Sequence, residues 1–145
     1  VFDGLIKDLN TRIDYYLDVL TSGVIRFSFT SDEIKGKFTE SCEYSGMNRS
    51  TDSLSGGEFR RLSLAVDLAL ADVVSNRASV VLNVLFLDEA FDGLDVSGKE
   101  AVMTLLELMT RAKDSIFVVD HGSEAKAVFA QVFKLVKRNG ETSVE

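Results

Sequence analysis

A nearly unbroken apolar run, Val80 to Leu87, constrains the fold more than any other feature of this sequence. Only Asn83 interrupts the run, and such a segment is typical of a central strand that is buried on both faces. A helix that ends near Ser75 precedes the run. A second helix, from about Ser97 to Ala112, follows it, and Ile116 to Val119 then form another buried strand. Strands that alternate with helices predict an α/β fold with a parallel sheet and right-handed crossovers.

The first 21 residues predict a helix with a narrow apolar seam. The seam residues are spaced alternately by four and three, as in a coiled coil; they are Phe2, Ile6, Leu9, Ile13, Tyr16 and Leu20. No capping signal precedes them, so we expect residues 1–21 to be the end of a longer coiled-coil helix, closed by Ser22-Gly23. The alternative is an ordinary amphipathic helix that packs on the domain.

A period of two follows this helix. Ile25, Phe27 and Phe29 share one face of a strand, and 37–44 alternate again, which predicts an antiparallel partner. The polar run 45–53, SGMNRSTDS, is expected to be a loop. The next helix, which begins at a glycine pair, should present one apolar face, formed by Leu62, Val66, Ala69 and Val73.

The C-terminal segment predicts a short helix and a hairpin. Ser123-Glu124 is a signal for a helix start. Asn139-Gly140 separates two strand-like segments, 132–138 and 141–144. An Asn-Gly pair in this position favours a tight primed turn.

Composition limits the possible classes of protein. The chain has 145 residues, of which 46% are hydrophobic and 27% charged, as expected for a single soluble domain. No apolar stretch approaches the ~20 residues of a membrane span, and no targeting segment is evident. The chain has one cysteine, Cys42, so it cannot form an internal disulfide, and with only one histidine besides it cannot supply the four ligands of a usual zinc site. The single cysteine is also consistent with a reducing, cytoplasmic compartment. The net charge of −7 argues against a dominant nucleic-acid surface on this chain.

The segment VLFLDEAFDGLD delivers two acids to a strand end. Asp88 and Glu89 follow the apolar run directly, and ligands of open α/β sheets bind at the carboxyl edge of the strands. Two adjacent acids there suit two tasks: one faces bound magnesium, and the other polarises the water that attacks a phosphate. The alternative is a pair of solvated acids without a ligand.

A Ser-Gly-Gly turn opens the preceding helix. Ser55 is a natural N-cap, while Gly56 and Gly57 leave the amides of the first turn accessible to an anion, which the helix dipole favours. The alternative is a plain capping motif with a flexible hinge. Arg60 and Arg61 lie close to the start of this helix, where a cation opposes the dipole by a few tenths of a kcal/mol. We therefore expect an anionic group nearby.

A single histidine stands just beyond the second buried strand. His121 follows Asp120 in the segment VVDH and should lie in the same layer as Glu89. This position suits a sensor of a terminal phosphate. The alternative is a surface or capping histidine.

The three segments together resemble the motifs of ABC-type ATPases. LSGGE, VLFLDEAFDGLD and VVDH occur in the order of that family's signature motif, Walker B strand with D-loop, and switch histidine. The resemblance is close from Leu54 to His121. The expected coiled coil, Glu58 where transporters usually have glutamine, and the wide gap between Gly57 and Asp88 resemble the Rad50 and SbcC branch, including exonuclease large subunits of T4-like phages.

The resemblance implies a role for each matched residue. Ser55, Gly56 and Gly57 would contact the γ-phosphate of ATP bound to an opposing subunit, and Glu58 would belong to the same cofactor-binding motif. The remaining residues serve the nucleotide of their own subunit or the contact between subunits: Asp88 would hold Mg²⁺, Glu89 would orient the attacking water, Asp95 would bridge the subunits and His121 would sense the γ-phosphate. Asp120 departs from the small or hydroxyl residue that usually precedes the histidine, and its negative charge would repel nucleotide.

This sequence contains neither a Gly-Lys-Ser/Thr phosphate loop nor a glutamine loop. The resemblance therefore implies a C-terminal ATPase lobe, 1–145, made of a coiled-coil end (1–21) and the lobe itself (22–145), and inactive in isolation. The implied partners are its own N-terminal Walker A lobe, a second head, an Mre11- or SbcD-like nuclease and, through the complex, DNA, but no membrane.

Two other ATPase classes and a non-enzymatic class stay open. A transporter ATPase uses the same motifs, but it should carry the phosphate loop on the same short chain and no heptads. A cohesin- or condensin-like structural head would look almost identical and would bind kleisin-like chains instead of a nuclease. A catalytically dead interaction module is disfavoured because Ser55, Asp88, Glu89 and His121 are all present.

Overall fold

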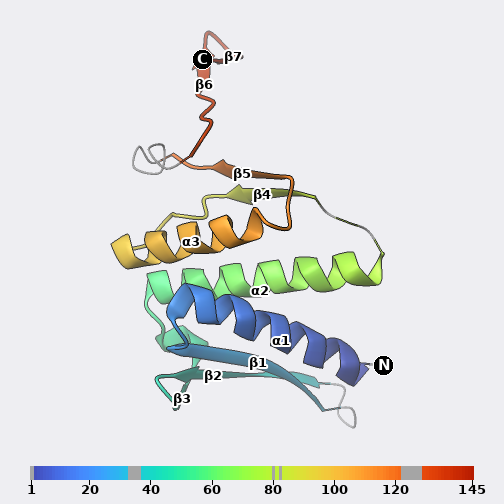
Figure 1. The fold of residues 1–145 in the computed structure, drawn as a ribbon. Helices are drawn as coiled ribbons and strands as arrows, with labels where there is room; N and C mark the ends of the chain where they lie inside the picture. Colours follow the sequence, from blue (N-terminus) through green and yellow to red (C-terminus); the bar gives the residue numbers. More distant parts are fainter. Residues whose placement is uncertain (1, 33–36, 80, 82, 122–128) are drawn as a thin grey trace.

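The computed structural model describes residues 2–32, 37–79, 81, 83–121 and 129–145. Its helices lie between two sheets: the antiparallel sheet β1–β3 covers α1 and α2 on one side, and α3 separates them from the parallel pair β4–β5 on the other (Figure 1). The elements, in chain order, are α1 (Phe2–Thr21), β1 (Ile25–Asp32), β2 (Lys37–Tyr44), β3 (Met47–Arg49), the 3₁₀ turn η1 (Thr51–Ser53), α2 (Gly56–Arg77), β4 (Val84–Asp88), α3 (Val96–Met109), β5 (Ser115–Val119), β6 (Leu135–Arg138) and β7 (Glu141–Val144).

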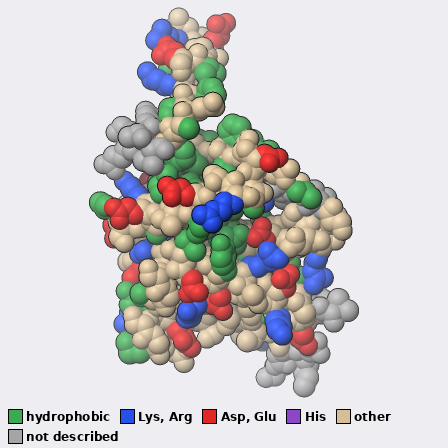
Figure 2. All heavy atoms as spheres, in the orientation of Figure 1, with side chains coloured by type: hydrophobic (Ala, Val, Ile, Leu, Met, Phe, Trp, Pro, Cys, Tyr) green, Lys and Arg blue, Asp and Glu red, His purple; other side chains and the backbone are tan. Residues whose placement is uncertain are grey.

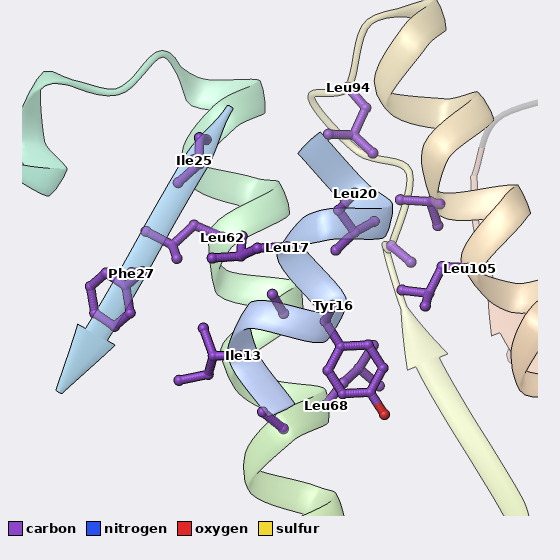
Figure 3. Close-up of a cluster of buried hydrophobic side chains, with 14 of the residues drawn as sticks. Ile13, Tyr16, Leu17, Leu20, Ile25, Phe27, Leu62, Leu68, Leu94 and Leu105 are labelled. Carbon is purple, nitrogen blue, oxygen red and sulfur yellow. The ribbon is translucent and has the colours of Figure 1, made fainter. Parts of the chain in front are cut away.

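Helix α1 is packed into the domain through its C-terminal half. Ile13 and Leu17 are completely buried, and they face α2 and β1, whereas Leu20 points toward α3 (Figure 3). The helix ends where predicted, because Ser22 and Gly23 both adopt positive φ angles, of 51° and 73°. The C-terminal half of α1 thus packs on the domain like an ordinary amphipathic helix, which is the alternative to a coiled coil given above. A coiled coil that extends from this helix stays a prediction.

A polar cluster fastens α1 to α2. The hydroxyl of Tyr16 donates to Asp72 Oδ2 at 2.5 Å, and Arg12 Nη1 donates to the same oxygen at 3.2 Å. Burial and the hydrogen bond to Asp72 raise the pKa of Tyr16 well above its usual value. Arg12 also pairs with Asp8 one turn earlier in α1. These side chains fix the position of α1 along α2.

The antiparallel sheet confirms the predicted pair of strands and adds a third strand. β1 and β2 pair from Ile25↔Tyr44 to Asp32↔Lys37. Ile25 and Phe27 face the core. The prediction of a loop over 45–53 is wrong in part, because β3 pairs with β2 and η1 follows it. Ser45 and Gly46, with φ angles of 52° and 77°, form the tight primed turn that makes this hairpin possible.

Both long helices after the sheet confirm their predictions closely. α2 extends two residues past the expected end at Ser75, and three members of its predicted apolar face are buried while the fourth is half-buried. α3 begins at Val96 and ends at Met109, so it is shorter than predicted at its C-terminus. Leu105 of α3 belongs to the same buried cluster as Leu20 and Leu94 (Figure 3).

The parallel pair β4–β5 confirms the predicted α/β order, with a register from Val84↔Ser115 to Asp88↔Val119. The expectation that the first strand is buried on both faces is wrong for its described residues, because burial alternates along β4. Leu85 and Leu87 pack against the core, whereas Phe86 is 71% exposed. Alternate side chains of a strand point to opposite faces, and only one face of this pair rests on the core. Val80 and Leu82 lie outside the described residues.

The C-terminal hairpin projects from the body (Figure 1). β6 and β7 pair around Asn139 and Gly140, both at positive φ, which confirms the primed turn. β6 begins at Leu135, three residues later than predicted. The predicted helix at Ser123-Glu124 lies outside the described residues. In the described part of the chain, the helices are too short or too polar to cross a bilayer.

Charged side chains of both signs are mixed over the visible face of the body, and hydrophobic side chains gather near its top, below the hairpin (Figure 2). Among the described residues on this face, no continuous basic surface appears. The whole chain carries a net charge of −7.

Candidate functional site

The carboxyl end of β4 carries two exposed acids. Asp88 is the last residue of the strand, and Glu89 follows it with a φ angle of 53°. A residue other than glycine in this left-handed region costs roughly 1–2 kcal/mol. The backbone N–H of Glu89 donates to Val119 O at 2.9 Å, and its carbonyl accepts from Asp92 N at 3.1 Å. Because hydrogen bonds hold both sides of this residue, the strained conformation is kept at an exposed edge.

His121 lies next to Glu89, as its place after β5 predicts. Its Nε2 atom is 3.9 Å from Glu89 Oε1, and its side chain is 86% exposed. The imidazole forms an ion pair with the carboxylate only when it is protonated. The structure therefore brings together two of the predicted site residues from adjacent parallel strands. Their catalytic roles stay predictions.

The Ser-Gly-Gly turn forms a complete capping box. Ser55 Oγ accepts from Glu58 N at 3.3 Å, and Ser55 N donates to Glu58 Oε2 at 2.8 Å. Hydrogen bonds to the Glu58 carboxylate from the backbone N–H and the side chain of Ser55, with smaller help from Tyr44, hold the pKa of Glu58 below its usual value. The carboxylate of Glu58 thus serves the helix start, and a contact with nucleotide stays a prediction. A Cβ atom added at Gly56 would meet no atom within 4 Å, so the space beside its amide is open.

The turn lies on the same edge as the acids. Arg60 Nη2 donates to Glu89 O at 2.6 Å and approaches Asp88 O at 3.4 Å. A Cβ atom added at Gly57 would lie 3.3 Å from Gly93 O, in the segment that follows Glu89. The start of α2 and the end of β4 are therefore in direct contact.

The two arginines near the start of α2 have backbone oxygens as partners. Arg61 donates from Nε to Gly57 O at 3.3 Å and from Nη1 to Leu20 O at 3.4 Å, which ties α2 to the end of α1. The sequence predicts an anionic group near these cations. Their hydrogen bonds go to carbonyl oxygens, and those of Arg60 belong to Asp88 and Glu89. The expected anionic group is nonetheless close to Arg61, because its charge helps to lower the pKa of the Glu58 carboxyl. Sequence reasoning missed Arg60 as a member of the site, although a cation that opposes the helix dipole was the available signal.

Asp95 caps the next helix. Its Oδ1 atom accepts from Gly98 N at 2.8 Å, and the residue is exposed beside the turn after β4. This hydrogen bond is the usual role of an N-cap aspartate. Its predicted bridge to a second subunit is untested.

Asp88 and Glu89 could bind Mg²⁺ only together with oxygen atoms from a bound phosphate or from water. In the ranges that the structure describes, no group of three or more His, Cys, Asp or Glu residues could enclose a metal ion. Mg²⁺ usually keeps several waters and binds through one or two carboxylates together with phosphate oxygens. An exposed carboxylate such as that of Asp88 fits this mode of binding.

Solved structures with a similar arrangement are SMC ATPase heads. One, from work on the ATP-driven dimerization and DNA-stimulated activation of SMC ATPases, superposes with a TM-score of 0.81 at 14% identity and covers 99% of this chain and 86% of that chain. An SmcHead bound to the C-winged helix domain of ScpA gives a TM-score of 0.76 at 15% identity, with 99% of this chain and 44% of that chain covered. At these identities the similarity shows the fold alone.

Sequence relatives are longer proteins. The C subunit of nuclease SbcCD from Lactococcus lactis subsp. lactis (strain IL1403) is 39% identical over 87 residues, which are 59% of this chain and 8% of that protein. The probable exonuclease subunit 2 of Escherichia phage T5 is 30% identical over 118 residues, 81% of this chain and 18% of that protein. Exonuclease subunit 2 of Enterobacteria phage T4 is 28% identical over 130 residues, 88% of this chain and 22% of that protein. The chain thus spans less than a quarter of the length of these relatives.

A family model described as SbcC/RAD50-like, Walker B motif, matches residues 26–108. The match covers more than half of the chain and includes both the Ser-Gly-Gly turn and the acidic end of β4. The chain belongs to the SbcC/RAD50-like Walker B family.

Proposed function

We propose that this chain is the C-terminal half of the ATP-hydrolysing head of an SbcC/Rad50-like exonuclease subunit, which acts in DNA double-strand-break processing and recombination. One observation carries the proposal: the exposed turn at Ser55–Gly57 and the acids Asp88 and Glu89 share one edge of the molecule, joined through Arg60. The family match, and the relatives named as subunits of a nuclease and an exonuclease, support the proposal.

The turn serves as a phosphate site. Gly56 has open space beside its backbone, and the first amides of α2 point out of a helix of 22 residues. Such amides, together with the helix dipole, favour an anion. In the proposed arrangement, Ser55, Gly56 and Gly57 of one head contact the terminal phosphate of a nucleotide held by the opposing head.

The acidic edge serves the nucleotide of its own head. ATP with Mg²⁺ supplies the phosphoryl group that is transferred to water. Asp88 binds the metal ion through its exposed carboxylate, and Glu89 orients a water molecule and accepts its proton. His121, 3.9 Å from Glu89, senses the terminal phosphate. Asp95 caps α3 at the point where the opposing head approaches.

The solvent-exposed face of β4–β5 is the proposed binding surface for an N-terminal Walker A lobe. Val84, Phe86, Phe117 and Val119 are exposed there, and the rings of Phe86 and Phe117 stack with their centroids 4.9 Å apart. Exposed apolar patches of this kind mark interaction surfaces. The relatives are several times longer than this chain. A complete head pair would therefore combine two lobes from each of two subunits.

The proposed partners follow from the relatives. The Lactococcus relative is named as part of a nuclease, SbcCD, so we propose an Mre11- or SbcD-like nuclease subunit as the partner, with DNA bound through the complex in the cytoplasm of a bacterium or a phage-infected cell. The SMC heads with a similar fold favour a structural SMC head as the second candidate. Purification of the full-length protein with its partners separates the two: a metallophosphoesterase-type nuclease supports the first, and a kleisin-like chain supports the second.

Glu89→Gln in the full-length protein tests the proposed chemistry. Loss of a general base lowers turnover by about a hundredfold to ten-thousandfold, while ATP binding is retained and the heads stay closed. ATP turnover and ATP-dependent head association are the two measurements. Unchanged turnover would remove Glu89 from the catalytic role.

The 145-residue chain alone tests the need for the other lobe. We expect no ATP turnover and no tight binding of Mg-ATP, because the chain contains no Gly-Lys-Ser/Thr phosphate loop. Isothermal titration calorimetry measures the affinity. Micromolar binding by the isolated chain would contradict a composite site.

A further inference from the structure

One cationic side chain near the start of α2 reaches across to the backbone of Glu89. Arg60 Nη2 lies 2.6 Å from Glu89 O and 3.4 Å from Asp88 O. A guanidinium at this end of a helix opposes the dipole, so helix stability gives no reason for its presence. Both oxygens are carbonyls of the two acids at the end of β4. The side chain therefore acts on the acidic strand end.

Glu89 is the residue at this edge whose backbone most needs support. Its φ angle of 53° lies in the left-handed region, which costs a non-glycine residue roughly 1–2 kcal/mol. A hydrogen bond to Val119 O holds its N–H, and its carbonyl accepts from both Asp92 N and Arg60 Nη2. The bond from Arg60 is charge-assisted, and such bonds are shorter and about twice as strong as neutral ones. Strained backbone persists only where its surroundings fix it.

The direction of the Glu89 side chain depends on this conformation. The φ and ψ angles fix the direction of the Cα–Cβ bond relative to the strand, so relaxation out of the left-handed region would swing the carboxylate away from its present place. That place is 3.9 Å from His121 Nε2. For a catalytic group, a misplacement of about 1 Å can lower the rate by about a hundredfold.

We propose that Arg60 is a positioning residue for Glu89: by holding the Glu89 carbonyl, it keeps the carboxylate aimed at the reaction site. The inference rests on the proposed role of Glu89 as the residue that orients the attacking water. Arg60 itself touches no reacting atom in this scheme. It links the start of α2, which carries the Ser55–Gly57 turn, to the catalytic carboxylate of the same head.

Arg61 provides a matched comparison. It lies next to Arg60 in α2, but it donates to Gly57 O and Leu20 O and so ties α2 to α1. Loss of Arg61 should affect how firmly the helices are joined, and loss of Arg60 should affect the chemical step. Arg77, an exposed arginine in the last turn of α2, is a control for charge, because it is far along the helix from the site.

The test uses ATP turnover by the full-length protein with the variants Arg60→Gln, Arg60→Lys, Arg61→Gln, Arg77→Gln and Glu89→Gln, together with the double variant of Arg60→Gln and Glu89→Gln. Arg60→Gln should lower kcat about tenfold to a hundredfold, with KM and the melting temperature close to those of the unmodified protein. Arg60→Lys, which keeps a donor and a charge, should recover part of kcat, and Arg77→Gln should change nothing. In the Glu89→Gln background, Arg60→Gln should have little further effect, because residues that act through one another are not additive.

The possible results separate the inference from the function on which it rests. A KM effect without a kcat effect, equal kcat losses for Arg60→Gln and Arg61→Gln, or multiplicative losses in the double variant would overturn the positioning role. If Arg60→Gln does not fold, Arg60→Lys decides: a lower kcat with an unchanged melting temperature supports the role, and an unchanged kcat contradicts it. Turnover that depends on Glu89 but not on Arg60 removes the inference alone. No turnover by the unmodified full-length protein removes both.

Discussion

Two regions of the molecule differ in how far their apolar side chains are buried. One is the region where α1, α2 and β1 pack together, and the other is the strand pair β4–β5. Ile13 and Leu17 are completely buried among side chains of the same chain. In β4 and β5, Phe86 is 71% and Phe117 is 44% exposed, although both are large aromatic residues. The first region buries its apolar surface by itself, whereas the second leaves an apolar face open to solvent.

The buried region accounts for the stability of the fold, and the exposed region carries the proposed functional residues. The helical region holds the fold, because buried apolar area is the main source of folding free energy. The open region carries Asp88, Glu89 and His121 at its edge. The proposed second lobe would cover the apolar face that β4 and β5 leave exposed beside this edge.

Truncation of matched apolar residues in the two regions should give the largest contrast. Leu17→Ala in the 145-residue chain should lower the free energy of unfolding by about 2–5 kcal/mol. Phe86→Ala should lower it by less than about 1.5 kcal/mol, because it removes chiefly the stacking with Phe117. Urea denaturation measures both. Equal losses would show that β4–β5 is as well covered as the helical region.

The polar contact between α1 and α2 should have a smaller effect. Asp72→Asn keeps the shape of the side chain but removes the charge that Tyr16 and Arg12 share, and we expect a loss of about 1–3 kcal/mol. Asp67→Asn, at an exposed position of the same helix, is the control and should stay within about 0.5 kcal/mol. Similar unfolding curves for both variants would mean that the cluster does not hold the helices together.

The capping box at the edge should have the smallest effect, and one that depends on pH. The pKa of Glu58 is lowered in the folded state by its hydrogen bonds to Ser55, so its contribution is present above the unfolded pKa of about 4.3 and is lost as the pH falls through the folded pKa. Glu58→Gln should therefore reduce stability slightly near pH 7 and flatten the loss of stability on acidification. An unchanged pH profile between pH 7 and pH 3 would contradict the role of this carboxylate.

The sequence predicted local structure well where a turn or a cap carries a strong signal. Ser55 marks the start of α2, Asn139-Gly140 marks the hairpin, and Ser22-Gly23 marks the end of α1. The strand β3 was missed because Ser45-Gly46, a primed turn, lies inside a polar run that carries no apolar alternation. The hairpin of β2 and β3 therefore depends on the geometry of its turn and not on a hydrophobic pattern in β3.

Burial and long-range contacts could not be predicted to the same degree. The apolar run over 80–87 was expected to be buried on both faces, but apolar character does not show whether a covering element belongs to the same chain. By contrast, the order of the motifs did predict that Glu89 and His121 lie close together, because parallel strands end at one edge of the sheet. The contact from Arg60 to Glu89 O depends on where the start of α2 lies relative to the residues that end β4, and sequence pattern does not reveal it.

Complementation between two inactive variants of the full-length protein tests the central claim, that the turn and the acids of one chain serve two different nucleotides. Gly56→Ala fills the open space beside the turn without a clash in its own chain, and Glu89→Gln removes the catalytic carboxylate. If the turn acts on the opposing head, co-expression of the two variants creates mixed dimers with one intact site. Turnover should then rise to about a quarter of the unmodified level, because about half of randomly paired two-fold dimers are mixed and each has one working site of two. Turnover that stays at the average of the two separate variants would contradict the claim, because it would mean that the turn and the acids act on the same nucleotide.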